Sequence, residues 1–309
     1  MKKMFFLYNP HSGKGQISSY LAEIIDIFTK GGYDVTAHPT QFKGDACESV
    51  KQFVGSYDVI ACSGGDGTLN EVIMGVMDGG WHKPIGYIPA GTMNDFSSNL
   101  GISKYMPDAA SIIANGVPQF VDIGGFNREY FTYVAAFGVF TSVSYATDQQ
   151  KKNELGVLAY IIEALKNIDI GTRYNLTIEC NGQKITDSFI YGMVANSFSI
   201  GGIKGLAGND VSINDGLFEG IFIKAPKTIV ELSKTLNALI KHEFDSPYFY
   251  YFKSDNFHFT AETPVPWTID GEYGGDAIEN SISVYHNAIK FIAREIIDMG
   301  SVTDEAAEE

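Results

Sequence analysis

The N-terminal part of the chain alternates short apolar runs with segments in which apolar residues recur every three or four positions. Short apolar runs bounded by turn residues are typical of buried strands, and the second spacing is typical of helices that pack by one face. The predicted strands cover residues 3–8, 34–38, 59–63 and 85–88, and the predicted helices include 17–28 and 45–54. Strands and helices that alternate at such short intervals predict an α/β domain, with a parallel sheet covered on both faces.

The pattern changes to strands after Gln119–Ile123, the segment that closes this predicted domain. Apolar and polar residues alternate from 173 to 180, just before Asn181-Gly182, which predicts a half-buried hairpin arm with a two-residue turn. Further strands are predicted at 189–198, 216–223, 248–252, 257–261 and 281–285, and helices at 154–168 and 228–241. This pattern predicts a mostly antiparallel β-sandwich or barrel.

The predicted organisation is therefore an α/β domain over residues 1–123 and a β-sandwich domain over 124–289. Gly124-Gly125 is a candidate hinge or turn where the second domain begins. We expect the segment 290–309 to cross back to the first domain in part, because it opens with apolar residues. Its last seven residues, 303–309, are mostly acidic, which indicates a solvated end.

Composition narrows the classes of partner. The 309-residue chain carries a net charge of −15, which argues against sequence-independent binding of nucleic acid and against a general attraction to anionic membranes. The apolar run after Lys2-Lys3 is too short for a signal peptide, and the uncharged stretch 130–147 has the Ser, Thr and aromatic content of buried strands. The three cysteines form neither a metal motif nor an even disulfide set. We expect a cytoplasmic protein.

The stretch Ser63–Glu71 stands between a buried strand and a helix, and it is rich in glycine. Such a turn lets backbone N–H groups converge on an anion, and the N-terminus of the following helix favours phosphate. Asp66 places a carboxylate there, which makes sense if it reaches a cation carried by the phosphates, usually Mg²⁺. The plainer interpretation is a Gly/Asp turn in which Thr68 is the N-cap of the helix.

Three other loops follow predicted strands and are expected at the same edge of the sheet, where ligands of parallel sheets bind. The run Asn9–Gly15 could hold phosphate through Ser12, Gly13 and backbone N–H groups, although it lacks the leading glycine of a Walker loop. Thr40 could meet a nucleotide or be a plain loop residue. Pro89–Phe96 is another glycine-led entry into a helix.

Three blocks carry a family resemblance. Gly64-Gly65-Asp66-Gly67-Thr68 resembles the nucleotide-binding signature shared by diacylglycerol kinases, sphingosine and ceramide kinases, NAD kinases and phosphofructokinases. The run Pro89–Phe96, followed by Leu100-Gly101-Ile102, resembles the bacterial diacylglycerol kinases and their eukaryotic lipid-kinase relatives and differs from NAD kinases. Tyr8–Gly13 is similar to the same family. The chain thus resembles an ATP- and Mg²⁺-dependent lipid kinase.

The resemblance implies roles for individual residues. It places ATP on Thr92 and on two runs, the first being Asn9, Pro10, His11, Ser12 and Gly13, and the second Gly64, Gly65, Asp66, Gly67, Thr68, Leu69 and Asn70. Asp66 would bind Mg²⁺ on the phosphates, directly or through water. In the second domain, the family's D-G-x-F block implies that Asp215 holds magnesium, with the carbonyls of Ser212 and Leu217 as lesser candidates.

The family places its catalytic acid on the D-G-E turn, which here is Asp270-Gly271-Glu272, although such a turn alone is ordinarily structural. A lipid hydroxyl needs a carboxylate to accept its proton, and we expect Glu272 to be that base because its side chain is longer, with Asp270 beside it. Asp270 remains the alternative base.

We therefore predict a lipid kinase. We expect it to be cytoplasmic and peripheral to the membrane, with transient contact to the membrane surface. A homodimer is compatible with the predicted fold. A soluble-substrate kinase of the NAD kinase type and a nucleotide-binding regulator without activity are the alternatives. Diacylglycerol, phosphatidylglycerol, an isoprenoid alcohol and a sphingoid base all offer a suitable hydroxyl. Aromatic residues in 130–145 and the run 200–206 are expected either to line a pocket for the lipid tail or to be core.

Overall fold

The computed structural model describes residues 1–91, 94, 96–97, 100–138, 173–196, 199–200, 203–204, 212–241 and 243–294. The chain divides into two compact units. Unit 1 contains Met1–Val121 together with the chain from Ala288 onward, and unit 2 contains Asp122–Asn287. Each unit is considered by itself below.

The strands of unit 1 follow the order β15-β4-β3-β1-β2 within their sheet. They are β1 (Lys2–Tyr8), β2 (Tyr33–Pro39), β3 (Val59–Gly64), β4 (Ile85–Pro89) and the end of β15 (Glu272–Ala293). The pairs are parallel, with Phe5 opposite Thr36 on one side and opposite Ile60 on the other. The central strands β3 and β4 are buried along their whole length, which explains their continuous apolar runs.

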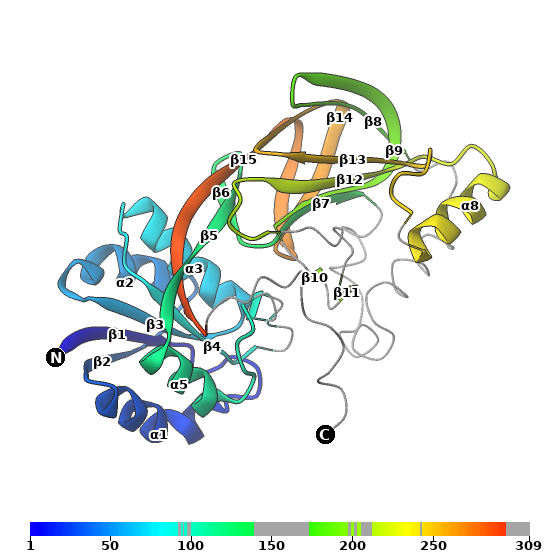
Figure 1. Ribbon diagram of the computed structural model, residues 1–309. Coiled ribbons are helices and arrows are strands. Elements are labelled where there is room, and N and C mark those ends of the chain that lie inside the picture. The colour runs from blue at the N-terminus through cyan, green and yellow to red at the C-terminus, as the bar shows by residue number, and fades with distance from the viewer. Residues whose placement is uncertain are drawn as a thin grey trace. The chain divides into compact units, whose positions relative to one another are not determined.

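Helices cover both faces of this sheet (Figure 1). α1 (Ile17–Lys30) packs with α5 (Met106–Asn115), and α2 (Asp45–Phe53) packs with α3 (Asp66–Asp78). The buried residues of α1 are Ile17, Ile24 and Phe28, which recur at helical spacing. A short 3-10 helix, Val54–Ser56, follows α2. The predicted α/β character of the first domain is confirmed.

The predicted hinge at Gly124-Gly125 is wrong. Both glycines lie inside one continuous strand, β5 (Val117–Phe126), and pair with β6 (Glu129–Phe131). They are needed for close packing: a Cβ on Gly124 would lie 2.2 Å from the ring of Phe131, and one on Gly125 would lie 2.6 Å from the ring of Tyr285. Glycine in a strand can mark close approach of a neighbour as well as a turn.

Unit 2 is rich in strands, most of which pair with their neighbours in antiparallel fashion. Its elements, besides parts of β5 and β15, are β6, β7 (Val134–Gly138), β8 (Tyr174–Cys180), β9 (Gln183–Ala195), β10 (Ser199–Ile200), β11 (Ile203–Lys204), β12 (Phe218–Lys224), α8 (Ile229–Ile240), β13 (Phe249–Ser254) and β14 (Asn256–Ile269). The strand-rich character of this unit is confirmed, whereas a two-layer sandwich stays a prediction.

The core of unit 2 is aromatic. Trp267 is fully buried, and its ring lies 4.9 Å, centroid to centroid, from the rings of Phe137 and Phe259. The predicted hairpin is present between β8 and β9, and its turn residues Asn181 and Gly182 both have positive φ, as a two-residue turn of this kind requires.

The predicted helix 228–241 is present as α8, which begins where the hydroxyl of Thr228 accepts a hydrogen bond from the backbone N–H of Glu231. The predicted helix 154–168, all of 139–145, most of 200–206 and the acidic end lie outside the described residues. The aromatic residues Phe131, Tyr133 and Phe137 of the described part are buried core. No helix in the described part of the chain is long and apolar enough to cross a membrane.

Candidate functional site

Three loops meet at the carboxyl ends of β1, β3 and β4 in unit 1. The hydroxyl of Ser12, in the loop after β1, accepts a hydrogen bond of 3.0 Å from the backbone N–H of Gly65, in the loop after β3. The amide of Asn9 donates to the hydroxyl of Thr68 at 3.3 Å. The structure therefore brings together the two runs in which sequence motifs predicted nucleotide contacts.

Close backbone contacts explain why these loops are made of glycine. A Cβ on Gly13 would lie 2.3 Å from the carbonyl oxygen of Ala90, and Gly13 also has a φ of +56°. A Cβ on Gly91 would lie 2.6 Å from the Cα of Gly65, so the loop after β4 touches the loop after β3. Side chains at these positions would push the loops apart.

The loop after β3 leads directly into a helix. Gly65 is the N-cap of α3 and Asp66 is its first residue, so Thr68 is not the N-cap that the plainer interpretation expected. The unpaired N–H groups of a helix N-terminus attract anions. A Cβ on Gly67 would meet no protein atom within 4 Å, which leaves open space beside these N–H groups.

Leu69 and Asn70 form the rest of the first turns of α3. The side chain of Leu69 is buried in the core, and its N–H donates to the carbonyl of Gly65 at 3.1 Å. The side-chain oxygen of Asn70 is buried and has no hydrogen-bond partner in the described part of the chain. Pro10 and His11 lie in the turn after β1, where the N–H of His11 donates to the side chain of Asn9 at 2.9 Å.

Asn94 and Tyr87 support these loops, and the motif analysis had assigned neither a role. The side-chain oxygen of Asn94 accepts from the N–H of Gly91 at 2.9 Å, and its amide donates back to the carbonyl of Gly91 at 2.8 Å. The hydroxyl of Tyr87 lies 3.1 Å from the carbonyl oxygen of Gly64. Burial, and then the charge of Asp66, raise the pKa of Tyr87 far above its usual range, so this hydroxyl remains a donor. Asn94 lies within the run Pro89–Phe96, so the sequence motif already contained this residue.

Thr40 joins the same edge of the sheet, since its N–H donates to the carbonyl of Tyr8 at 2.9 Å. Glu71 of α3 accepts hydrogen bonds from the N–H groups of Gly44 and Ala46, at 2.8 and 3.3 Å, and thereby fixes the start of α2. The predicted contact Thr92 lies outside the described residues.

The two carboxylates of the turn Asp270-Gly271-Glu272 in unit 2 have different surroundings. Asp270 accepts four hydrogen bonds: from the N–H and hydroxyl of Thr132 at 2.6 and 2.8 Å, and from the N–H groups of Tyr133 and Val134 at 3.0 and 3.1 Å. Burial raises the pKa of Asp270 to about 6, although the backbone donors oppose the rise. Glu272 is exposed at the start of β15. Asp270 therefore holds the turn in place, and Glu272 is accessible to a ligand.

The turn 212–217 carries the predicted magnesium ligands. One oxygen of Asp215 accepts from the N–H of Leu217 at 3.0 Å, and the other lies 2.8 Å from the ammonium of Lys253. Ser212 donates from its hydroxyl to the side chain of Asn214 at 3.0 Å. Among the residues that the structure describes, no group of three His, Cys, Asp or Glu side chains could hold a metal ion.

Asp122 also holds the turn 212–217 in place, through a hydrogen bond to its backbone. This carboxylate is fully buried and accepts 2.6 Å hydrogen bonds from the N–H groups of Gly216 and Asn287, and it pairs with His286 at 3.0 Å. Sequence reasoning missed Asp122, because no local motif marks it and its partners lie far away in the chain.

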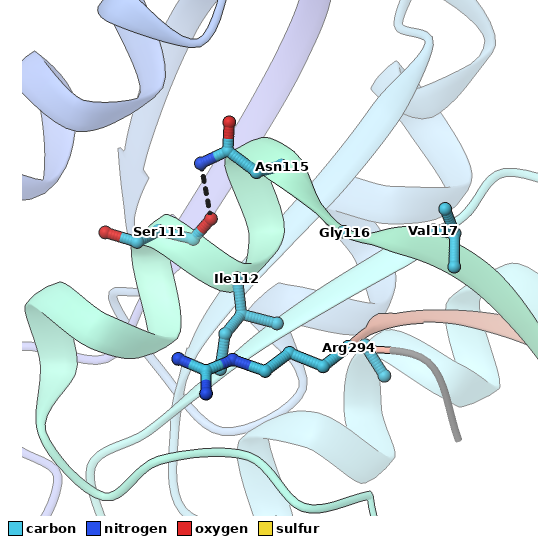
Figure 2. A pocket seen from close by; sticks show the side chains of 7 residues that line it. Ser111, Ile112, Asn115, Gly116, Val117 and Arg294 are labelled. Carbon is cyan, nitrogen blue, oxygen red and sulfur yellow. Dashed lines mark hydrogen bonds between the residues drawn. The ribbon is translucent and has the colours of Figure 1, made fainter. Parts of the chain in front are cut away.

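A cavity of about 470 Å³ opens elsewhere in unit 1, at the end of α5 (Figure 2). Arg294 and Ile112 lie side by side there, and the amide of Asn115 donates to the carbonyl of Ser111 at 2.9 Å. None of the residues that motifs assigned to nucleotide, metal or base lines this cavity.

Comparisons with known proteins agree on one family. Residues 3–126 match the model of the diacylglycerol kinase catalytic domain. The chain is 30% identical over 289 residues to a diacylglycerol kinase of Bacillus subtilis (strain 168), covering 93% of this chain and 95% of that one. It is 31% identical over 299 residues to a diacylglycerol kinase of Staphylococcus aureus (strain MRSA252), covering 96% and 94%.

Solved structures show the same fold. A diacylglycerol kinase structure from Bacillus anthracis str. Sterne has a TM-score of 0.75 at 21% identity, covering 95% of this chain and 97% of that one. The predicted resemblance is confirmed by the sequence relatives, which align over nearly the whole chain. The chain belongs to the diacylglycerol kinase family, which is a family of lipid kinases.

Proposed function

We propose that this protein transfers the γ-phosphoryl group of ATP to the hydroxyl of diacylglycerol in an Mg²⁺-dependent reaction. The observation that carries the proposal is the cradle formed by Ser12, Gly65 and Gly91. There, glycine backbones touch one another beside the N-terminus of α3. A site of this kind binds phosphates through backbone N–H groups.

The cradle fits a nucleotide with its metal. Mg²⁺ is usually bound by one or two carboxylates together with the phosphates of the substrate, so Asp66 is a sufficient protein ligand, directly or through water. The N–H groups of Gly67 and Thr68 would face the phosphates, because those of Gly65 and Leu69 already donate to Ser12 and to the carbonyl of Gly65. The loop Asn9–Gly13, Thr40 and Thr92 would complete the nucleotide contacts. When bound, Mg²⁺ neutralises the charge that develops on the transferred group.

Glu272 is the proposed base that accepts the proton of the acceptor hydroxyl. Its carboxylate is exposed, whereas each oxygen of Asp270 already accepts two hydrogen bonds. A carboxylate so fully occupied is poorly placed to take a proton from a substrate. Asp270 is thus a positioning residue that fixes the turn from which Glu272 projects.

Diacylglycerol is the proposed acceptor because the full-length relatives bear its name. We further propose that the protein is cytoplasmic and meets its substrate by transient contact with the membrane surface. The net charge of −15 argues that such contact depends on the lipid acceptor more than on anionic headgroups. A homodimer is compatible with the fold and is open to test by light scattering.

A kinase assay with γ-labelled ATP tests the proposal. Purified protein is incubated with Mg²⁺ and one acceptor at a time in mixed micelles: diacylglycerol, phosphatidylglycerol, an isoprenoid alcohol or a sphingoid base, with NAD as the soluble acceptor. Label in phosphatidic acid is expected. Label in NAD would support the soluble-substrate alternative. Binding of ATP without transfer to any acceptor would support the regulator.

A further inference from the structure

A buried carboxylate and a turn carboxylate share one ammonium group in unit 2. The Nζ atom of Lys253 lies 2.8 Å from an oxygen of Asp215 and 3.2 Å from an oxygen of Glu219. Glu219 is 1% exposed, whereas the side chains of Asp215 and Lys253 are each about 30% exposed. Two carboxyl groups and one ammonium group therefore meet beside the turn 212–217.

The sheet fixes this arrangement. Glu219 on β12 and Lys253 on β13 are directly opposite each other in the antiparallel register, so their side chains share one face. Within the described part of the chain, Lys253 is the one cation that pairs with Glu219, so its ammonium offsets this buried carboxylate. Moving Lys253 away would leave Glu219 buried and uncompensated, which is costly.

The donor set at this turn does not fit a divalent cation. One oxygen of Asp215 accepts a backbone N–H and the other faces the ammonium, so a metal bound there would lie next to a positive charge. The magnesium site that the family resemblance placed at Asp215, Ser212 and Leu217 would require Lys253 to leave Asp215.

We propose that the ammonium of Lys253 is the resident cation of the turn 212–217 and takes the place of a divalent metal there. The turn is then held by parts of the chain alone: Lys253 on Asp215, and Asp122 on the N–H of Gly216. This inference concerns the folding of unit 2 and does not rest on the proposed kinase activity.

Thermal unfolding of the full chain without nucleotide tests the inference. The wild type is melted in EDTA, in Mg²⁺ and in Mn²⁺, beside Lys253→Met, Lys253→Arg and the double variant Lys253→Met/Asp215→Asn. Each variant is also made with Asp66→Asn, so that metal at the nucleotide loop makes no contribution. We expect the same Tm for the wild type, within about 1 °C, in all three conditions.

Lys253→Met is expected to lower the Tm in EDTA by roughly 5–10 °C, because it leaves a buried carboxylate unpaired. It is also expected to regain part of that loss in Mg²⁺ or Mn²⁺, because two carboxylates without the ammonium suit a divalent cation. The double variant should lose this regain, and Lys253→Arg, which keeps the charge, should behave like the wild type.

The inference is overturned if the Tm of the wild type falls in EDTA and is restored by Mg²⁺ in the Asp66→Asn background. It is equally overturned if Lys253→Met melts like the wild type and shows no response to either metal. Should Lys253→Met fail to fold, the wild type and Lys253→Arg still decide, since a metal-dependent Tm in either contradicts the inference and a metal-independent Tm in both supports it.

Discussion

The hydroxyl of Ser12 accepts a 3.0 Å hydrogen bond from the backbone N–H of Gly65, although the two residues lie 53 positions apart in the chain. This bond helps to join the loop after β1 to the loop after β3. It aligns the start of α3 with the turn at Asn9–Gly13, and so it shapes the cradle in which we place the phosphates of ATP.

Ser12→Ala should therefore weaken the binding of ATP. The N–H of Gly65 then loses its acceptor, which costs about 1–3 kcal/mol of stability, and the two loops lose the bond that aligns them. The KM for ATP is therefore expected to rise several-fold with a smaller change in kcat. Ser18→Ala, at an exposed position of α1, is the matched control and should leave both constants unchanged. Equal kinetic constants in the two variants would contradict a role of the Ser12 hydroxyl in ATP binding.

Gly91→Ala and Gly67→Ala should have different effects, because the first glycine is needed for loop packing and the second lies beside the proposed phosphate site. The new Cβ at 91 would lie 2.6 Å from the Cα of Gly65, whereas the one at 67 would meet no protein atom within 4 Å. We expect Gly91→Ala to lower the Tm, and Gly67→Ala to keep or raise it while weakening ATP binding. Calorimetry on both variants tests this. Unimpaired ATP binding in Gly67→Ala would show that the open space beside α3 is not where the phosphates lie.

Replacing the two carboxylates of the turn 270–272 by amides should change kcat and Tm in different ways. Glu272→Gln keeps the shape and removes the basicity, so kcat should fall by roughly 10²–10⁴ with an unchanged Tm. Asp270→Asn replaces an acceptor of four hydrogen bonds by an amide that cannot accept them all, so it should lower the Tm as well as the activity. Near-normal turnover in Glu272→Gln would assign the base to Asp270.

Stability should depend on pH through Glu219. Burial raises the pKa of this carboxyl from 4.5 to about 7, while Lys253 opposes the rise. Between these values the folded protein binds the proton more tightly than the unfolded chain. The contribution of Glu219 to stability is therefore full below about pH 4.5 and is lost as the pH rises through 7.

Relative to Glu219→Gln, the free energy of unfolding of the wild type should fall by roughly 1 kcal/mol per pH unit between pH 5 and 7. Urea titrations of both proteins across this range give the difference. Parallel pH profiles would mean that Glu219 does not bind a proton in this range in the folded state.

Local patterns in the sequence predicted β1 to β4 and α1 to α3 of unit 1 and the turn at Asn181-Gly182, because periodicity and turn chemistry depend on neighbouring residues. They did not predict α5. They misassigned Gly124-Gly125, since a glycine needed to admit the rings of Phe131 and Tyr285 looks in sequence like a glycine needed for a turn.

Local sequence patterns could not show which residues far away in the chain contact the predicted site residues. Motifs marked Asp270 and Asp215 but could not show that the first binds the backbone at 132–134, 138 residues away in the case of Thr132, or that the second meets Lys253. Asp122, whose contacts join β5, the turn before β12 and β15, has no local signal at all.

The most direct measurement is the transfer of γ-labelled phosphate from ATP to diacylglycerol in mixed micelles, with the wild type and Asp66→Asn compared at equal concentration. Asp66 begins α3 on the loop side, where its carboxylate can meet Mg²⁺ on the phosphates, and Asn keeps its size while removing its charge. We expect labelled phosphatidic acid with the wild type, and almost none with Asp66→Asn at an unchanged Tm. Equal labelling by the two proteins, or no labelled lipid from the wild type, would contradict this expectation.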